Sequence, residues 1–430
     1  MIKAGTGIAA LDLTPVLPIE GFNVIQNDLH VRTIILDGKK RMVIVSVEVT
    51  SLQEDSVVRF LGKIKEMTGA DDDCIWMTFT HSFAGPHVFL PPKPGQHRPG
   101  PEKSPEELQK GLLLEKAYFR ALEESIEAAL GSFKDAVIGA GEGRSFVNTS
   151  RNVLTDSGWA TGSDDDLACD RTLKVLRIDS PCGEPIALIY NYGIRSNVMS
   201  RCRNEKNEEI ISCDLCGVTC TQLEKEFGDG FVAVFLCAAS TDSEPRYKST
   251  VTSAGHDGAE KTVRYDYRDC EVMLRAQAAQ LSSDIIKVYR KTETAEYDGD
   301  FRCAARETVC ERKKANPSGE VRDNTDTGEW ESDGTETLTV YAAALGPVTL
   351  AGVQPEIDSL TAIELAKAGG SGMVMPVIMV NGSGKALPAR QAYDLRQFPG
   401  IHSPYMPGTA EKLAETADKL IRDLRSGISG

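Results

Sequence analysis

One stretch of the chain reads Trp76-Met77-Thr78-Phe79-Thr80-His81-Ser82-Phe83-Ala84-Gly85-Pro86-His87, and it joins an apolar run to polar residues. The apolar run at 74–80 predicts a short buried strand. His81 follows the end of that strand, and His87 lies just past a Gly-Pro turn. Sites in α/β proteins usually lie at strand ends. Either histidine can therefore bind a metal or transfer a proton, although a histidine in a loop is more often structural.

The segments around this stretch alternate between strands and helices. The runs at 31–36 and 42–47 predict two strands joined by a tight turn. Ser51 with Glu54 predicts a capped helix start, and Ser104-Pro105-Glu106-Glu107 predicts a stronger one, for a helix that ends near Leu130. Further strands are expected at 172–178, 186–191, 231–237, 337–342, 348–353 and 373–380, and further helices at 216–227, 272–289, 359–368 and 409–424. The pattern indicates an α/β fold in which helices flank mixed β-sheets.

We expect one domain over residues 1–430. The length fits one large domain or two ordinary ones, but no linker is long enough to separate two domains, and there is no internal repeat. Residues 316–334 are polar and contain many Gly and Asp residues, which predicts a loop insertion at the surface.

Composition limits the partners and the compartment. The net charge of −15 disfavours nucleic acids and anionic membrane surfaces. No run approaches the roughly 18 apolar residues of a membrane span, and the N-terminus does not read as a secretory signal. We therefore expect a cytoplasmic protein with a small-molecule substrate, and a homo-oligomer is compatible with the sequence. The 11 cysteines are expected to be free thiols, including the group Cys213, Cys216 and Cys220.

Polar residues follow two further predicted strands. The strand at 186–191 is followed by Arg195, and the strand at 231–237 runs into Asp242-Ser243-Glu244-Pro245-Arg246. A surface arginine and a polar turn are the ordinary explanations for these residues. Both segments can also line a cleft, and Asp214 at the start of the intervening helix can join them.

The last such segment is Ala351-Gly352-Val353-Gln354-Pro355-Glu356. Glu356 follows a strand that looks buried, so it is a candidate metal ligand or base. The turn Asn381-Gly382-Ser383-Gly384-Lys385 follows the next strand. This turn is not a phosphate-binding loop, because no helix is predicted directly after it.

Taken in order, these segments resemble the catalytic domain of the neutral/alkaline non-lysosomal ceramidases and their bacterial relatives. The resemblance covers nearly the whole chain. It starts at 7–15, which is similar to the family's opening G-x-x-x-x-D-I-T-P, and it ends at 403–411, which is similar to its late S-P-F-A-P-G-A-G-E. The resemblance implies the fold of that catalytic domain and hydrolysis of an amide.

Members of this family hold zinc through two histidines, a glutamate and a tyrosine, and the zinc activates water. His81 matches the first histidine of the family's T-H-T-H-S-G-P, whose second histidine has become Phe83. Glu356 matches the acid of G-V-P-G-E. The histidine of N-F-A-x-H-P-T falls on Arg195, which stays protonated and cannot serve as an ordinary ligand. The tyrosine falls on Ser383.

The altered ligand set allows two interpretations. In the first, one divalent metal is held by a rebuilt site: zinc, or Mn or Mg because carboxylates favour harder ions. The candidates to join His81 and Glu356 as ligands are Asp214, Asp242, His87 and Glu244, and we select Asp214. In the second, the guanidinium of Arg195 takes the metal's place and binds a carboxylate or polarises a carbonyl.

The candidate site residues divide into two groups. The candidate catalytic residues are His81, Arg195, Asp242 and Glu356. The candidate substrate-binding residues are Arg195, His87, Ser243, Arg246 and Ser383. In sequence, Arg195, Arg201, Arg203 and Arg246 gather around the proposed cleft, which indicates an anionic substrate.

Three function classes follow. We favour a hydrolase that cleaves an amide, ester or lactone bond of a small polar, anionic metabolite, with or without a metal. The first alternative is a metal-free lyase or isomerase on a sugar-acid-like compound, in which Arg195 stabilises an enolate. The second is a binding protein without catalysis. The fold alone does not separate these classes.

Overall fold

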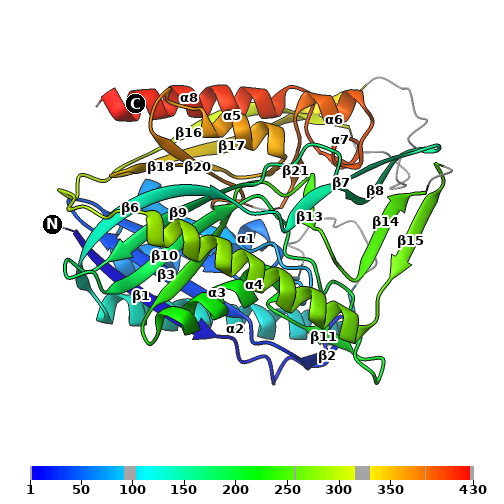
Figure 1. The fold of residues 1–430 in the computed structure, drawn as a ribbon, viewed down its shortest axis with the longest axis horizontal. Coiled ribbons are helices and arrows are strands. Elements are labelled where there is room, and N and C mark those ends of the chain that lie inside the picture. The colour runs from blue at the N-terminus through cyan, green and yellow to red at the C-terminus, as the bar shows by residue number, and fades with distance from the viewer. Residues whose placement is uncertain (1, 92–102, 256–257, 315–329, 383, 427–430) are drawn as a thin grey trace.

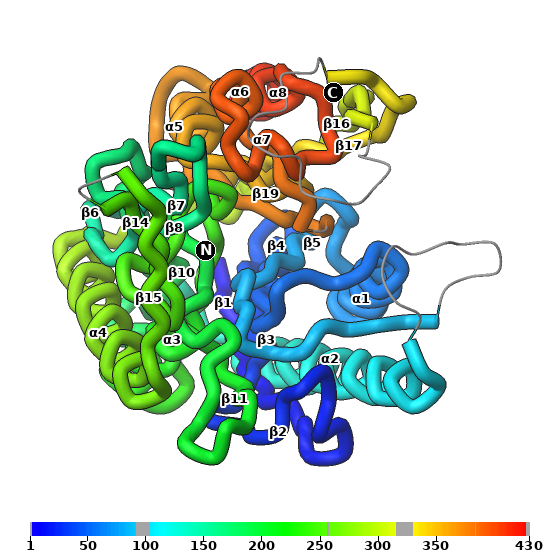
Figure 2. The backbone as a smooth tube through the Cα atoms, turned by 90° about the vertical axis from the view of Figure 1, so that its right-hand side faces the viewer, coloured from blue at the N-terminus to red at the C-terminus, as the bar shows by residue number. Residues whose placement is uncertain are grey.

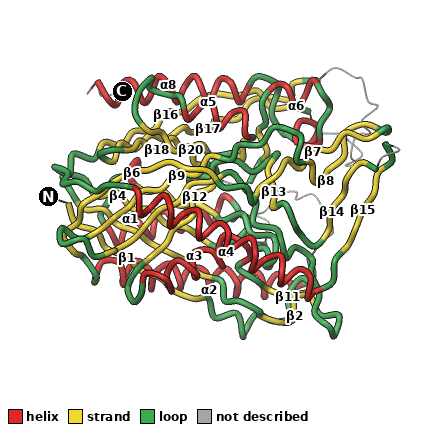
Figure 3. The backbone as a smooth tube through the Cα atoms, viewed as in Figure 1, coloured by secondary structure: helices red, strands yellow, loops and turns green. Residues whose placement is uncertain are grey.

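The computed structural model describes residues 2–91, 103–255, 258–314, 330–382 and 384–426. Its elements form four layers: helices, a sheet, a second sheet and further helices (Figures 1 and 3). Both sheets have one face against helices and the other against the opposite sheet. Strands that are covered on both faces need mostly continuous apolar runs rather than alternating ones, and this is the pattern of β4 (Arg41–Val47) and β5 (Ile75–Phe79).

The larger sheet has eight strands and mixes parallel with antiparallel pairs. In spatial order its strands are β12 (Val232–Cys237), β10 (Pro185–Tyr192), β9 (Thr172–Asp179), β6 (Lys134–Arg144), β1 (Ile2–Ala10), β3 (His30–Asp37), β4 (Arg41–Val47) and β5 (Ile75–Phe79). The second sheet consists of β16 (Arg302–Lys313), β17 (Ser332–Leu345), β18 (Val348–Val353) and β20 (Met373–Val377).

Short strands form small sheets near the ends of the two large ones. They are β2 (Phe22–Ile25) with β11 (Glu209–Ile211), β13 (Ser243–Pro245) with β7 (Asn148–Thr155) and β8 (Gly158–Asp164), β14 (Thr250–Ala254) with β15 (Glu260–Arg264), and β19 (Glu356–Ile357) with β21 (Ala386–Leu387).

Helices cover the outer face of each large sheet. Those against the eight-stranded sheet are α1 (Glu54–Thr68), α2 (Pro105–Gly131), α3 (Asp214–Phe227) and α4 (Tyr267–Lys291). Those on the side of the second sheet are α5 (Ser359–Ala366), α6 (Arg390–Asp394), α7 (Phe398–His402) and α8 (Thr409–Ser426). Residues Asp72–Cys74 form a 3₁₀ turn directly before β5. No helix among the described residues is long and apolar enough to cross a membrane.

Successive residues of a strand face different layers of the core. On β3, Val31 and Ile35 pack toward the helices, whereas Ile34 and Leu36 pack between the two sheets. All four side chains are fully buried. Trp76 of β5 also lies between the sheets, where it meets Tyr341 of β17 edge-on. Because of this alternation, the position of a residue along its strand determines whether its side chain points toward the helices or toward the other sheet.

The second sheet bridges the two edges of the first. Ile378 N, just after β20, donates to Cys237 O on β12 at 2.9 Å. Asn381 lies on the β5 side: its Nδ2 donates to Ile75 O at 2.7 Å, its Oδ1 accepts from Met77 N at 2.8 Å, and its backbone N donates to Met77 O at 2.9 Å. The chain ends that follow β5, β12 and β18 therefore meet.

Most predicted elements are confirmed, with differences at their ends. The helix start at Ser104 has both hydrogen bonds of a capping box. The capping box predicted for Ser51 and Glu54 is wrong: Gln53 is the N-cap residue of α1, and it makes no side-chain cap. The strand predicted at 373–380 ends at Val377, because Met379 and Asn381 take positive φ angles of 53° and 52° in the turn toward β5.

Three expectations about the rest of the chain have different outcomes. All eleven cysteines are free, as expected, and those of α3 are buried. The loop predicted at 316–334 lies mostly outside the described residues, and β17 already begins at Ser332. The single domain over 1–430 stays a prediction.

Candidate functional site

Four polar side chains meet where strands of the two large sheets end. His81 follows β5, Arg195 follows β10, Ser240 follows β12, and Glu356 follows β18. The pairs β4–β5, β10–β12 and β18–β20 are each parallel, so neighbouring strands end on the same side. Carboxyl ends of parallel strands commonly position functional side chains in α/β folds.

One carboxylate oxygen organises this cluster. Oε2 of Glu356 accepts a hydrogen bond from Arg195 Nη2 at 2.9 Å and from Ser240 Oγ at 3.0 Å. His81 Nε2 lies 3.1 Å from the same oxygen, without the alignment of a hydrogen bond. Burial alone would raise the pKa of Glu356, but the charges of His81 and Arg195 hold that pKa well below its usual range.

The backbone and an aromatic ring fix His81 in place. Its φ angle is +55°, an uncommon conformation for a residue other than glycine. Its Nδ1 lies 2.9 Å from the carbonyl oxygen of Thr50, so that nitrogen donates a proton and the ring presents Nε2 to Glu356. The ring meets Phe83 edge-on at 4.8 Å, and the Arg195 guanidinium lies 5.2 Å from the centre of the same Phe83 ring.

A second group of buried charges adjoins the first. Arg151 of β7 is only 5% exposed, and its Nε lies 3.3 Å from Glu244 Oε1. Lys248 contacts the other oxygen of Glu244. Burial, with the positive charge of Arg195, lowers the pKa of Arg151. We missed Arg151, Lys248 and Ser240 in the sequence, because a single polar residue within or after a strand carries no pattern that marks it as buried beside a charge.

Several buried polar atoms of the site have no hydrogen-bond partner among the described residues. Besides Nε2 of His81 and Nε of Arg151, which lie near carboxylates, they include Nε of Arg195 and Oγ1 of Thr241. Buried donors are nearly always satisfied in folded proteins, so an exception at a candidate site indicates a bound molecule or water. The backbone N of Thr241 donates to Ile357 O at 3.2 Å, which ties this segment to the residue after Glu356.

Gly384 leaves space beside the central pair. A Cβ atom at this position would lie 3.1 Å from Glu356 Oε1 and 3.5 Å from His81 Cε1. The first distance is tighter than ordinary van der Waals contact. The glycine therefore keeps open a volume that touches both the carboxylate and the imidazole.

Asp214 and Asp242 hold backbone segments near the site. Asp214 accepts from the backbone N atoms of Val198, Met199 and Leu215 at 2.9, 3.0 and 2.6 Å, so it fixes the turn that follows Arg195. Oδ1 of Asp242 accepts from the N and Oγ atoms of Ser359 at 2.9 and 3.0 Å. Burial, with the nearby charge of Asp358, raises the pKa of Asp242 to about 7.

The other predicted substrate-binding residues do not join the cluster around Glu356. His87 is exposed, and its Nδ1 lies 3.1 Å from Glu20 Oε2. Ser243 is buried and donates to Gly193 O at 2.7 Å. Arg246 pairs with Asp165 at 3.0 Å. Ser383 lies outside the described residues.

The donor set around Glu356 does not fit a catalytic zinc ion. Such a site normally has three protein ligands, and His81 with Glu356 supplies only two. A third charged group, the guanidinium of Arg195, also contacts Glu356 Oε2, but it is a permanent cation and cannot bind a metal ion. Within the described ranges, no third His, Cys, Asp or Glu offers a ligand atom within 4.8 Å of both.

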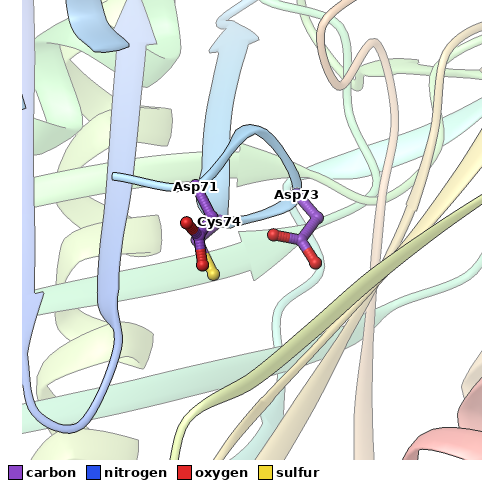
Figure 4. Close-up of side chains that lie close together, drawn as sticks. All are labelled: Asp71, Asp73 and Cys74. Carbon is purple, nitrogen blue, oxygen red and sulfur yellow. The ribbon is translucent and has the colours of Figure 1, made fainter. Parts of the chain in front are cut away.

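A group of three metal-ligating residues lies elsewhere. Asp71, Asp73 and Cys74 present ligand atoms within 4.8 Å of one another (Figure 4). They precede β5, whereas His81 follows it, and five residues of strand span about 16 Å. Asp71 is exposed and accepts a hydrogen bond from Lys40 Nζ at 2.9 Å. This group is separate from the cluster around Glu356.

Comparisons with known proteins find similarity in structure only. No protein-family model matches the sequence, and no curated protein matches it. The neutral ceramidase from Pseudomonas aeruginosa superposes with a TM-score of 0.72 and 15% identity, over 100% of this chain and 75% of that one. A ceramidase complexed with C2 gives a TM-score of 0.72 and 14% identity, over 99% of this chain and 76% of that one. The chain therefore has the fold of the neutral ceramidases, as its motifs predicted.

Proposed function

We propose that the chain is a hydrolase for an amide, ester or lactone bond of a small anionic metabolite, and that it works with the charge of Arg195 in the place where the family's motif has a metal ligand. The observation that carries the proposal is the cluster around Glu356 Oε2, in which the Arg195 side chain is only 14% exposed and keeps its buried Nε–H donor unpaired. A fixed donor in a buried site can polarise a carbonyl and stabilise the oxyanion that forms on it.

Each residue of the cluster has a role that follows from its contacts. Glu356 stays ionised, because its pKa lies well below the usual range. It is therefore a poor proton acceptor at neutral pH, and it acts as the counter-charge that orients Arg195 and His81. We place the scissile carbonyl in the space that Gly384 leaves open beside Glu356 Oε1 and His81 Cε1. Asp242, with its pKa near 7, has the affinity for protons that suits acid–base catalysis.

The substrate we infer differs from ceramide, the lipid amide after which the similar proteins are named. Arg151 lies close enough to Arg195 for the charge of Arg195 to lower its pKa. Two neighbouring guanidinium groups favour an anionic ligand. We therefore propose a polar metabolite rather than ceramide.

The test is a panel of N-acyl amino acids, sugar-acid lactones and short-chain esters, with the product mass measured for each. Hydrolysis opens a lactone to one product that is heavier by one water, and it cleaves an amide or ester into two products whose masses sum to the substrate plus one water. Dehydration removes one water, and isomerisation leaves the mass unchanged. We expect hydrolysis products, and we expect Arg195→Gln to lower kcat/KM by about a hundredfold or more, the typical effect of removing an oxyanion donor. Arg290→Gln on the exposed face of α4 is the matched control.

Other outcomes contradict the proposal in distinct ways. An unchanged or dehydrated product would assign the lyase or isomerase class instead. Binding without any turnover would assign a binding protein. Unchanged kinetics in Arg195→Gln would remove the guanidinium from the mechanism.

A further inference from the structure

A cleft of about 680 Å³ lies beside the buried cluster. Three segments line it: the turn from Asn197 to Asn207, the start of β14, and the end of β15 with the first turn of α4. Figure 2 shows β15, α4 and β11 on this face of the molecule. The volume is in the range of small-molecule binding pockets. We call it the arginine cleft.

The charge of the arginine cleft is opposite to that of the chain. Its charged lining residues are the cations Arg201, Arg203, Lys248, Arg264 and Arg268 and the acids Glu205 and Asp266. Five cations thus face two acids in a protein whose net charge is −15. A concave surface with one sign of charge concentrates ligands of the other sign.

Contacts already occupy both acids and three of the cations. Glu205 accepts from Arg268 Nε at 2.9 Å, and Asp266 accepts from the backbone N of Asp269 at 3.0 Å. Arg203 lies 3.7 Å from Glu209, and Lys248 contacts Glu244.

Arg201 and Arg264 remain. Neither side chain makes a hydrogen bond or an ion pair with any described residue, although the backbone of Arg264 pairs with that of Thr250 between β14 and β15. Arg201 also has a φ angle of +56°, and a bulky residue persists in that conformation only where the surrounding structure holds it.

Two residues that line the cleft, Asn197 and Lys248, connect it to the site. Asn197 lies two residues after Arg195, and its Oδ1 is buried without a hydrogen-bond partner. Lys248 links the cleft to Glu244, and Glu244 links it to Arg151. A ligand in the cleft is therefore a neighbour of the reactive cluster.

We propose that the arginine cleft binds an oxyanion group of the substrate, a phosphate or a carboxylate, through Arg201 and Arg264. The inference rests on the proposed function, because it names the part of the substrate that lies outside the buried site. The substrate is then an amide, ester or lactone with a phosphate or carboxylate remote from its scissile carbonyl. Each guanidinium can form charge-assisted, bidentate hydrogen bonds with such a group.

The test is calorimetric titration of the full chain with inorganic phosphate and with succinate at constant ionic strength. The variant combines Arg201→Asn with Arg264→Gln, since asparagine tolerates a positive φ angle. The control combines Arg275→Gln with Arg290→Gln, which removes the same charge from α4. We expect the first variant to weaken binding of the preferred probe by about tenfold or more, and the control to bind like the native chain. Preference for phosphate or succinate identifies the group.

Arg195→Gln separates this proposal from the proposed function. If the Arg201/Arg264 variant loses binding while Arg195→Gln keeps it, the cleft is the oxyanion site, whether or not the panel yields a hydrolysed product. If Arg195→Gln loses binding and the Arg201/Arg264 variant keeps it, the anion binds in the buried site and the cleft proposal is overturned. The cleft proposal is also overturned if the native chain binds neither probe, with melting temperatures as the check on folding.

Discussion

Glu356 is the residue on which the site depends, because three side chains converge on one of its oxygens. Its pKa in the folded chain lies well below the ordinary value of about 4.3 that applies when it is unfolded. Ionised Glu356 therefore stabilises the fold fully above about pH 4.3, and this contribution is lost as the pH falls toward the folded pKa.

We expect Glu356→Gln to lower the free energy of unfolding by about 3 kcal/mol at pH 7, because it leaves the largely buried guanidinium of Arg195 without its counter-charge. Urea denaturation of both proteins from pH 8 down to pH 3 checks the sign. The difference between native chain and variant should be constant near neutrality and should shrink below about pH 4.3. A difference that stays constant to pH 3 would show that Glu356 is not held ionised by its neighbours.

Gly384 is important because of the side chain it lacks. We expect Gly384→Ala to lower turnover of a substrate from the panel by at least about tenfold, since its Cβ would fill the space beside Glu356 Oε1. The fold should be nearly unaffected, with a loss of about 1 kcal/mol or less in urea denaturation. Gly62→Ala is the control, because nothing lies within 4 Å of a Cβ there. Full activity in Gly384→Ala would place the scissile bond elsewhere.

Among the elements, the turn from β20 to Asn381 joins the two sheets. Asn381→Gly removes both side-chain hydrogen bonds with β5 but keeps a backbone that tolerates the φ angle of 52°. We expect a loss of about 2–3 kcal/mol in urea denaturation, because buried backbone groups of Ile75 and Met77 lose partners.

Asn381→Ala should destabilise by about a further 1 kcal/mol, since alanine is strained at that φ angle. If the glycine variant is as stable as the native chain, the bridge between β20 and β5 does not contribute as we describe.

Two helix starts that look alike in sequence differ in the structure. Ser104 accepts from Glu107 N at 3.2 Å, whereas Ser51 lies outside the first turn of α1 and makes no cap. We expect Ser104→Ala to cost about 1 kcal/mol and Ser51→Ala to cost a few tenths at most. Thermal melts of the two variants give the comparison, and equal shifts would contradict the cap assignment.

At the scale of the molecule, the strands buried on both faces were predictable, because short runs rich in apolar and β-branched residues, such as 31–36, seldom form any other kind of element. The central strand β1 was not, because Gly5 and Gly7 interrupt it. A Cβ at either glycine would collide with the backbone of α2, so glycine at these positions allows α2 to pack closely against β1. That requirement comes from tertiary packing and leaves no local signal.

The site was predictable to the extent that its residues follow strands. His81, Arg195 and Glu356 meet as their positions suggested. His87 is equally close to a strand end in sequence, yet the turn at Gly85 and Pro86 carries it to Glu20 at the surface. Arg151 joins the site from β7, which packs beside β13. Neither placement follows from local sequence, because both depend on how distant segments pair.

The central claim is that Arg195 supplies the positive charge at Glu356 where the ceramidase motif that this segment resembles has a metal ligand. The most direct test is the metal content of the chain purified without added metal or chelator, compared with His81→Ala, Glu356→Ala and Arg195→His. We predict substoichiometric metal in the native chain and in the two alanine variants, and a gain of bound zinc in Arg195→His, which restores a third ligand. One tightly bound ion per native chain that is lost in both alanine variants would contradict the claim.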